Sequence, residues 1–585
     1  MPIAPHDNSA VQPAQDFSVA EIFAIRGVNT NDSPLALNTE EMTVFKNFTL
    51  GPRFMKRRLG SALTGAEPGA GAITKVIGLG HLEQDSGVTL LFLGNNGTLY
   101  KLSAGTWSAS DKTNYTTSVD ASIVTFSTKS GASLESGTSS SGTTKYLIED
   151  ASKTWVPGAY KGKCVLILGE VKYILDNTVT VLFLSDRLNK DLDSSYQSQA
   201  YAIYALTPQA FIANGTDDVQ KYNLTTHTAL DGTHVSGGEA VPKFKYIAAH
   251  QGRLFGAKGI GNDNDRVFIT DLAVGEQFTK DTNLNINLSF LNDGDELTGI
   301  ASLPLVNGSV LIAAKNESVH TVEGDNVLNY ATHARFTKSG CIAPKTLKVS
   351  GRSALMLGYD GVLRFSGEGG VELIEKPIPI SEPIGSELAA FSVADRQAAC
   401  AEVFDNKYYL SVGTSMYIYD IIESIRRQQH IWSQLEYPYT FAFMHAAGNA
   451  LYAGSKTTGA VYQLFTGNDD EDERITATME TGWIQAPGSP TMQVDRIEIA
   501  ADEDSNVVLR VAYAKDGGSY GSYITATLDE DLGVYKFTIK DLGTLFKFKL
   551  VDNATGSPVR IAMPIRIFYS VDSFGPRDTK GDLSS

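Results

Sequence analysis

A short hairpin pattern recurs along this chain and constrains its fold more than any other feature of the sequence. In the clearest copy, ALMLGYDGVLRFSG (354–367), two apolar runs flank an Asp-Gly turn, a strong short-range signal for a β-hairpin. From Val219 onward, the second strands of successive copies begin about 43 to 54 residues apart. A period of about 40 to 50 residues that contains several short strands is typical of the blades of a β-propeller.

Additional apolar strands precede and follow most of these hairpins, which gives the four strands that a blade requires. The other copies of the hairpin lie at 88–102, 210–222, 253–270, 309–324, 407–420 and 450–465. We count seven units, and six is an alternative because the copies are divergent. The competing interpretation is a set of unrelated hairpins within a β-sandwich.

The composition also favours an all-β protein. The chain has 585 residues, which suggests two to four domains, and it contains 54 glycines and 51 Tyr and Phe residues together. Abundant glycine with aromatic and β-branched strands fits many tight turns. We expect no long amphipathic helix, and the best short candidate is 419–429.

Breaks in the repeat pattern indicate the domain boundaries. A Ser-, Thr- and Gly-rich stretch at 106–144 interrupts the period, so we expect a small β-domain inserted between neighbouring blades. After 475 the strands continue without the blade period, as in a β-sandwich. We expect the N-terminal segment to complete the final blade and close the ring. The predicted division is an N-terminal arm and propeller-closing segment at 1–72, a first blade at 73–110, the inserted β-domain at 111–203, the remaining blades at 204–475, a C-terminal β-sandwich at 476–572 and a flexible tail at 573–585.

The net charge of −17 argues against a protein that grips nucleic acid, because such binding needs clustered Lys and Arg. One basic cluster stands out near the N-terminus, and it consists of Arg53, Lys56, Arg57 and Arg58. It is a candidate docking arm toward an acidic partner or DNA. The alternative is a solvated loop that balances the acidic body.

An acidic run breaks the pattern at the end of the last blade. Its residues are Asp469, Asp470, Glu471, Asp472 and Glu473. A charge run of this kind indicates a linker between the propeller and the C-terminal domain. In an assembled ring it is also a candidate lining of the lumen.

The sequence offers no recognisable catalytic or metal-binding motif. It lacks a nucleophile elbow, a zinc-protease helix motif, a P-loop and a dinucleotide glycine fingerprint. Cys164, Cys341 and Cys400 are widely spaced within or beside apolar strands, so we expect buried free thiols. We therefore predict no enzyme activity and no cofactor. A pair of carboxylates suited to glycoside hydrolysis stays open, because a propeller brings distant loops together.

The N-terminus is polar, and no run approaches the roughly 20 apolar residues of a membrane span. We therefore expect neither a signal peptide nor membrane insertion. The chain is expected to be made in the cytoplasm.

Several segments resemble the β-propeller nozzle or hub proteins in the tails of short-tailed bacteriophages, also described as tail tubular or packaged-DNA stabilisation proteins. The resemblance lies in short stretches of sequence and in their order along about residues 20 to 475. The segments are RGVNTNDSPLAL (26–37), YLIEDASKTWVPGAYKGKCVLILGE (146–170), FIANGTDDVQKYN (211–223), AHQGRLFGAKG (249–259), DRVFITD (265–271), VLIAAKNESVHTVEGD (310–325), SGCIAPKTLKVSGRSALMLGYDGVLRFSG (339–367), FDNKYYLSVG (404–413) and MYIYD (416–420).

This resemblance implies a structural virion protein of the tail, assembled in the host cytoplasm. It implies a homo-oligomeric ring, expected to be a hexamer, beneath the portal and its adaptor. Tail fibre, spike or distal plug proteins would be further partners. Double-stranded DNA would pass through without tight binding, which an acidic wall favours. We expect the inserted β-domain, the C-terminal sandwich or both to make the ring contacts.

Three other functions stay open. A receptor-binding or glycan-binding tail-tip protein would not need to form a ring. A propeller glycosidase or depolymerase would need aromatic-flanked carboxylates at a central pocket. A cytoplasmic scaffold of the host is the third alternative. The sequence does not distinguish a nozzle from a stopper or a hub.

Overall fold

Strands make up nearly all the regular structure of the chain, so the prediction of an all-β protein is confirmed. The computed structural model describes residues 18–571, with gaps at 23–24, 52, 69–71, 85–86, 169, 186–187, 189–192, 231–240, 258–264, 271–285, 288–293, 307, 325–328, 367–377, 487–490, 502–508, 530–532 and 554–557. The predicted tail at 573–585 lies outside these residues. The α-helices are α1 (Gly385–Ala390), α2 (Val393–Gln397) and α3 (Ile421–Arg427), the last within the stretch where the sequence favours a helix. The 3-10 turns are η1 (Asp193–Tyr196), η3 (Pro344–Thr346) and η4 (Glu382–Ile384).

Seven four-stranded antiparallel units, here called repeat sheets one to seven, form the centre of the described chain; four of them are separate sheets, and sheets two, six and seven are parts of larger sheets. Sheet one consists of β6 (Val76–Gln84), β7 (Gly87–Gly94), β8 (Leu99–Ser103) and β9 (Thr106–Ala109). Sheet two consists of β10 (Ser122–Thr138), β15 (Ala200–Ala213), β16 (Gln220–Tyr222) and β17 (His227–Ala229). Sheet three consists of β18 (Tyr246–His250), β19 (Arg253–Ala257), β20 (Arg266–Ile269) and β21 (Ile286–Asn287). Sheets four and five are β22 (Leu297–Leu305), β23 (Gly308–Lys315), β24 (Ser318–Glu323), β25 (Ala331–Thr337); and β26 (Lys348–Ser350), β27 (Ser353–Gly358), β28 (Gly361–Ser366), β29 (Ile378–Pro379). Sheets six and seven are β30 (Cys400–Phe404), β31 (Lys407–Val412), β32 (Ser415–Asp420), β33 (Trp432–Glu436); and β34 (Phe441–Ala447), β35 (Ala450–Ser455), β36 (Val461–Leu464), β5 (Ser61–Leu63).

The first strands of the seven sheets contact one another in cyclic order, and the seventh returns to the first. The order is β6, β10, β18, β22, β26, β30, β34 and β6 again. A cluster of buried apolar side chains lies between every pair of neighbouring sheets, including the closing pair. The sheets therefore form a closed ring that is stabilised by apolar burial between neighbouring sheets.

The alternation of side chains along each strand explains this stacking. In β27, Ala354 and Met356 belong to the core shared with sheet four, whereas Leu355 and Leu357 belong to the core shared with sheet six. Successive side chains of a strand point to opposite faces, so a strand buried on both faces reads as a continuous apolar run. The predicted hairpin of this sheet is confirmed, since Leu357 pairs with Val362 across the turn.

The N-terminal segment supplies the last strand of the ring. Strand β5 pairs antiparallel with β36 of sheet seven, with Ala62 opposite Gln463. The expectation that this segment completes the final repeat agrees with the observed pairing. Closure joins chain segments about 400 residues apart, so the ring ends are fastened by a β-ladder.

The inserted β-domain begins within repeat sheet two, not between sheets as the sequence suggested. Strands β10 and β15 pair through the ring and continue outward into the insertion, with a register irregularity between Ser130 and Glu135. The outer half of β15 pairs with β12. The remaining strands are β11 (Leu147–Glu149), β12 (Cys164–Ile167), β13 (Glu170–Asn177) and β14 (Val181–Leu184). The sequence pattern did not indicate that the first half of β10, residues 122–130, belongs to the ring, because β10 is rich in Ser, Thr and Gly.

The C-terminal region forms two sheets around one buried core, together with strands from the N-terminal arm. One sheet is β1 (Ser18–Ile22), β47 (Ile565–Ser570), β40 (Met492–Ala500), β44 (Val534–Gly543) and β43 (Thr527–Asp529). The other continues repeat sheet six through β2 (Met42–Lys46), β39 (Ala477–Thr481), β45 (Phe546–Asp552), β41 (Leu509–Lys515) and β42 (Ile524–Thr525). The smaller elements are β3 (Phe48–Gly51), β4 (Phe54–Arg57) and β46 (Arg560–Ala562), and the hairpin β37 (Asp469–Asp470) and β38 (Glu473–Arg474).

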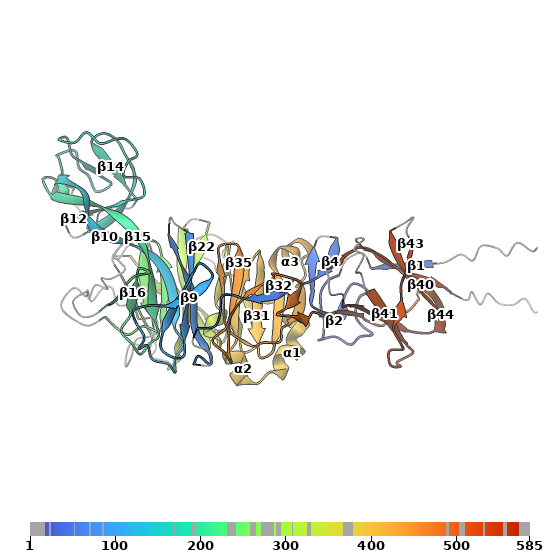
Figure 1. Ribbon diagram of the computed structural model, residues 1–585. Coiled ribbons are helices and arrows are strands. Elements are labelled where there is room, and N and C mark those ends of the chain that lie inside the picture. The colour runs from blue at the N-terminus through green and yellow to red at the C-terminus, as the bar shows by residue number, and fades with distance from the viewer. Residues whose placement is uncertain are drawn as a thin grey trace, which may run out of the picture.

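The whole molecule is elongated (Figure 1). The insertion, with β12 and β14, projects at one end, the ring lies in the middle, and the C-terminal sheets with β40 and β44 lie at the other end. Among the described residues, no helix has the length and apolar character needed to span a bilayer.

Candidate functional site

A cavity of about 540 Å³ lies at the centre of the ring, and we call it the axial cavity. Residues on or beside the first strand of all seven repeat sheets line it. Its wall contains the lysines and carboxylates Lys75, Asp120, Lys245, Lys345, Lys348, Glu402 and Lys456. Apolar side chains such as Leu79, Phe443 and Met444 form the rest of the wall.

Asp120 sits in one charged cluster of this cavity. Its carboxylate accepts hydrogen bonds from Lys75 Nζ at 2.8 Å and from Lys345 Nζ at 2.9 Å. Burial alone would raise the pKa of Asp120, but Lys345 and Lys75 outweigh it and hold the pKa below its usual value. Lys345 also lies over the ring of Phe443, 4.6 Å from its centroid. The cluster links sheets one and two to the segment before sheet five.

Glu402 organises a second cluster in the same wall. Lys348 Nζ donates to its Oε2 at 2.8 Å, and His445 Nδ1 lies 3.8 Å from the same oxygen. His445 Nε2 contacts His81 Nδ1 at 2.6 Å. Burial, Lys348 and His81 lower the pKa of His445 to about 3, and burial lowers that of His81. Both rings are therefore neutral at pH 7, so one donates to the other.

The axial cavity carries more positive than negative charge, although the chain is acidic overall. Five lysines line it against two carboxylates. Cys400 also lies in this wall, and burial outweighs the nearby charges in setting the pKa of its thiol. Burial raises the pKa of that thiol to about 11, which leaves it protonated and unreactive at pH 7. The cavity is thus suited to bind an anion.

The basic cluster of the N-terminal arm is divided by the fold. Arg53 is exposed and Lys56 is half-buried, whereas Arg57 and Arg58 are 0% and 1% exposed. Arg57 Nε lies 3.7 Å from the carboxylate of Asp552, which is also fully buried. Arg57 and Arg58 therefore cannot form an exposed docking arm. The reason is that β4 runs between the ring and the C-terminal sheets.

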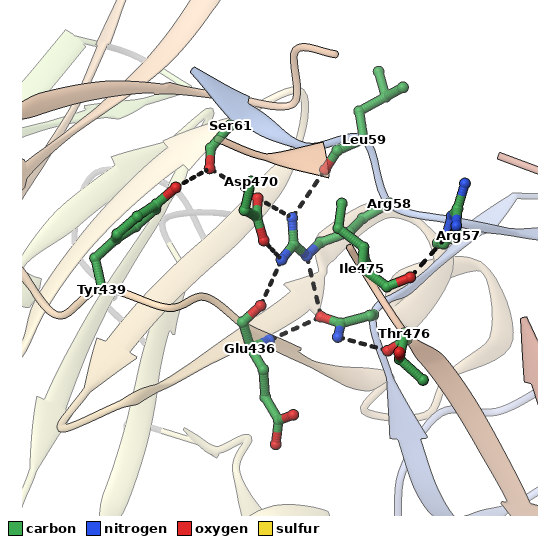
Figure 2. Close-up of polar contacts among 10 residues, drawn as sticks. Arg57, Arg58, Leu59, Ser61, Glu436, Tyr439, Asp470, Ile475 and Thr476 are labelled. Carbon is green, nitrogen blue, oxygen red and sulfur yellow. Dashed lines mark hydrogen bonds and ion pairs between the residues drawn. The ribbon is translucent and has the colours of Figure 1, made fainter. Parts of the chain in front are cut away.

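Arg58 instead pairs with Asp470 of the acidic run, in an arrangement that we call the clasp (Figure 2). Its two terminal nitrogens donate to the two carboxylate oxygens, with Nη1 to Oδ1 at 2.9 Å. Arg58 also donates to Asn47 Oδ1, and its guanidinium lies 3.9 Å from the ring centroid of Tyr437. Ser61 donates to Asp470 Oδ1 at 2.8 Å. Two charge clusters that look independent in the sequence thus form one buried ion pair.

The rest of the acidic run forms a hairpin instead of an extended linker. Strands β37 and β38 pair with each other, and the turn residues Glu471 and Asp472 have φ of 50° and 70°. Asp470 also pairs in parallel with Ser61 of β5. The other four acidic residues, Asp469, Glu471, Asp472 and Glu473, are exposed.

Sequence reasoning missed the axial cavity, although a signal for it was present. Lys75 and Lys245 each precede the first strand of a repeat sheet by one residue, and Asp120 precedes β10 by two. A charged residue at the same position of several repeats indicates a shared axial lining. Among the described residues, no group of three or more His, Cys, Asp or Glu side chains is arranged to hold a metal ion.

Comparisons with known proteins assign no family. No family model matches the chain, and no curated protein matches its sequence. Among solved structures, BamB from Moraxella catarrhalis is similar at 11% identity and a TM-score of 0.32, with 77% of this chain and 97% of that chain covered. BBS1N in complex with ARL6DN gives 10% identity and a TM-score of 0.34, with 71% and 99% covered. The computationally designed Ika8 protein gives 10% and 0.33, with 70% and 99% covered. These TM-scores lie below 0.5, so the description of the ring rests on its own strand pairing and contacts.

Proposed function

We propose that the seven repeat sheets form a seven-bladed β-propeller with an inserted β-domain and a C-terminal β-sandwich, and that the chain is a structural subunit of a short-tailed bacteriophage tail. Copies of the chain form a ring, expected to be a hexamer, beneath the portal and adaptor. This ring is part of the conduit that retains and then delivers double-stranded DNA. The order of the family-like segments in the sequence supports this proposal.

The observation that carries the proposal is the apolar surface of the insertion. Among the described residues, nineteen large apolar side chains are exposed, and seven of them lie in this small domain. They are Leu134, Tyr146, Val156, Leu168, Leu175, Val179 and Phe183. Leu175 and Phe183 lie on the paired strands β13 and β14, and Val179 lies in the turn between these strands. Neighbouring exposed apolar side chains of this kind mark surfaces that contact another protein. A subunit that assembles with its neighbours needs such a surface.

Strand pairing shows how part of this surface is built. Phe183 lies on β14 opposite Leu147 of β11, and Asp176 of β13 flanks it on the other side. Leu182 and Leu184, the neighbours of Phe183 in sequence, are buried in the core of the insertion. Because side chains alternate along a strand, Phe183 lies on the opposite, outer face of the sheet.

The connections between the parts of the chain also support a load-bearing role. Strands β10 and β15 continue from the ring into the insertion, and repeat sheet six continues through β2 into the C-terminal sheets. Continuous sheets fix the angle between parts more firmly than single-stranded linkers do. Such a body suits a wall that must resist the pressure of packaged DNA.

The charge of the chain fits a conduit that DNA does not adhere to. The net charge is −17, and the exposed acidic residues of the β37–β38 hairpin add a local negative patch. Cyclic symmetry would repeat that patch once per subunit around the ring. Repulsion between this wall and phosphates would let DNA slide. We propose this hairpin as a lumen-facing element.

Cryo-electron microscopy and mass photometry of the purified full chain test the proposal. We expect closed rings from the wild type and a shift toward monomers in the double variant Leu175→Ser, Phe183→Ser. The control is Tyr359→Ser, which removes a similarly exposed aromatic side chain from the ring. A wild type that stays monomeric both alone and with its portal–adaptor complex would refute the ring. An equal effect of Tyr359→Ser would refute the role of the insertion.

A further inference from the structure

The charges around the axial cavity point to a ligand. We propose that this cavity is a binding site for a compact polyanion, a molecule that bears two or more phosphate or carboxylate charges. This inference is independent of the proposed function, because it rests on the centre of one ring of sheets and needs no assembly.

The balance of charge in the wall is the first argument. Five lysines face two carboxylates, and Glu296, whose charge acts on Tyr246 of the wall, still leaves the cations in excess. Like charges held around one cavity repel each other, and a bound anion relieves that repulsion. Asp120 already divides its charge between Lys75 and Lys345. The two ammonium groups are therefore only half compensated by this carboxylate.

The accessibility of the lysines is the second argument. The side chains of Lys75, Lys345 and Lys348 are 35%, 18% and 26% exposed. They are thus open to a ligand, yet sheltered enough for their charges to act more strongly than on an open surface. Phe443, Met444 and Leu79 give the cavity an apolar wall beside the charges. Apolar walls with a few placed polar groups are typical of small-molecule sites.

The size of the cavity limits the class of ligand. A volume of about 540 Å³ falls within the range of sites for small molecules. A DNA duplex is too large to enter, because its major groove alone, roughly 12 Å wide and 8.5 Å deep, exceeds this volume within a single helical turn. The ligand is therefore a small polyanion and not the nucleic acid of the proposed conduit.

The overall charge of the chain makes the proposal sharply testable. At a net charge of −17, the surface as a whole repels anions. Binding of a polyanion would therefore identify a local site and not a general attraction. Pyrophosphate and citrate are suitable probes, because they separate phosphate from carboxylate recognition.

Isothermal titration calorimetry of the full chain with each probe is the experiment. We expect saturable binding to the wild type, weakened about tenfold by Lys345→Gln, because one charge-assisted hydrogen bond is lost. Asp120 keeps Lys75 as its partner in that variant. Asp120→Asn should instead tighten binding, since it releases both lysines for the ligand. A purely structural role of these residues would not produce opposite effects.

Lys407→Gln is the matched control. Lys407 lies in sheet six outside the cavity wall, is 21% exposed and pairs with Asp420 at 3.0 Å. The variant Lys407→Gln should leave the affinity for pyrophosphate and citrate unchanged. Tighter binding of pyrophosphate assigns a phosphate ligand, and tighter binding of citrate assigns a carboxylate ligand. The proposal is overturned if neither probe binds the folded wild type, or if Lys407→Gln weakens binding as much as Lys345→Gln.

Discussion

The insertion and the C-terminal sheets both extend from the ring, but they are built in opposite ways. The insertion leaves and re-enters the ring through the paired strands β10 and β15, and its main buried cluster contains residues from Ile148 to Ile203. The C-terminal sheets contain strands β1 and β2 from the N-terminal arm. Their core extends from Ile22 to Ile567 and merges with that of repeat sheets five and six.

This difference indicates which parts of the chain depend on one another for folding. A module with local contacts can fold by itself, whereas contacts between distant segments form only when the whole chain is organised. We therefore expect the insertion to be a separate folding unit. We expect the ring closure and the C-terminal sheets to fold and unfold together, with the clasp and the β5 ladder at their junction.

The clasp should have the largest effect on this joint unit. Asp470→Ala leaves Arg58, which is 1% exposed, without its carboxylate partner. Removal of one partner of a buried ion pair costs about 3–5 kcal/mol. Urea denaturation should show this loss in the transition of the ring and C-terminal sheets, whereas the insertion should keep its own transition.

Glu436→Gln is the matched control for the clasp. It breaks the ion pair of Lys46 with Glu436, whose side chains are 35% and 51% exposed. It leaves intact the Glu436 carbonyl that accepts from Arg58. Exposed pairs contribute about 0.2–1 kcal/mol. If Asp470→Ala and Glu436→Gln had equal effects, the clasp would not hold the unit together.

Substitution of two glycines, one at the junction and one in the insertion, compares the effect of added side-chain volume on these two parts of the chain. A Cβ at Gly60, beside β5, would lie 1.7 Å from the carbonyl oxygen of Asp469, so Gly60→Ala forces the backbone of the junction apart. We expect a loss of about 3 kcal/mol. A Cβ at Gly131, where the insertion begins, meets nothing within 4 Å, and its φ is 74°. Gly131→Ala should cost about 1 kcal/mol of backbone strain, measured by the same denaturation.

Acid should weaken the ring before the insertion. The folded-state pKa of His445 is about 3 and that of His81 is also lowered, so the unfolded chain binds protons first as pH falls below about 6.5. Stability is then lost with falling pH, by about 2 kcal/mol at pH 5 for a histidine with a pKa near 3. The insertion, 131–203, contains no histidine. Glu402, Glu83 and Lys348 surround this pair.

Thermal unfolding followed at pH 7 and pH 5 measures this difference. We expect the transition of the ring to move to lower temperature at pH 5 and that of the insertion to stay in place. His445→Gln should remove part of the pH dependence of the ring, and the double variant His445→Gln, His250→Gln should remove more, because burial also lowers the pKa of His250 of β18 to about 4. Equal shifts of both transitions would mean that the histidine contact at the closing sheets is not responsible.

The sequence predicted the features that depend on local patterns. The hairpin of β27 and β28 and the strand pair β15 and β16 follow from alternating apolar residues around turns. The start of the insertion was missed because β10 becomes a strand only by pairing with β15, 62 residues or more along the chain. The clasp was missed for the same physical reason. Arg58 and Asp470 are 412 positions apart, and no local pattern connects them.

The axial cavity shows the same limit more strongly. Its wall takes residues on or beside strands of all seven repeat sheets; sheet four contributes no charged residue, and each of the other sheets contributes one or two. The net positive charge of the cavity wall therefore depends on the assembled ring and is not visible in any single segment of the sequence. The net charge of −17 describes the chain as a whole, but it does not predict the excess of lysines over carboxylates in the wall of the axial cavity.

Removal of the insertion should have the smallest effect on the ring. Within the ring, β10 and β15 stay paired up to Ser130 opposite Ala205, so an Asn-Gly turn can join these two residues in place of 131–204. Because the insertion has its own core, the urea midpoint of the remaining chain should stay within the error of the measurement. The deletion should also remove the exposed apolar surface of the insertion and, with it, ring assembly. A shortened chain that fails to fold would show that the insertion is not a separate unit, and one that still forms rings would place the subunit contacts elsewhere.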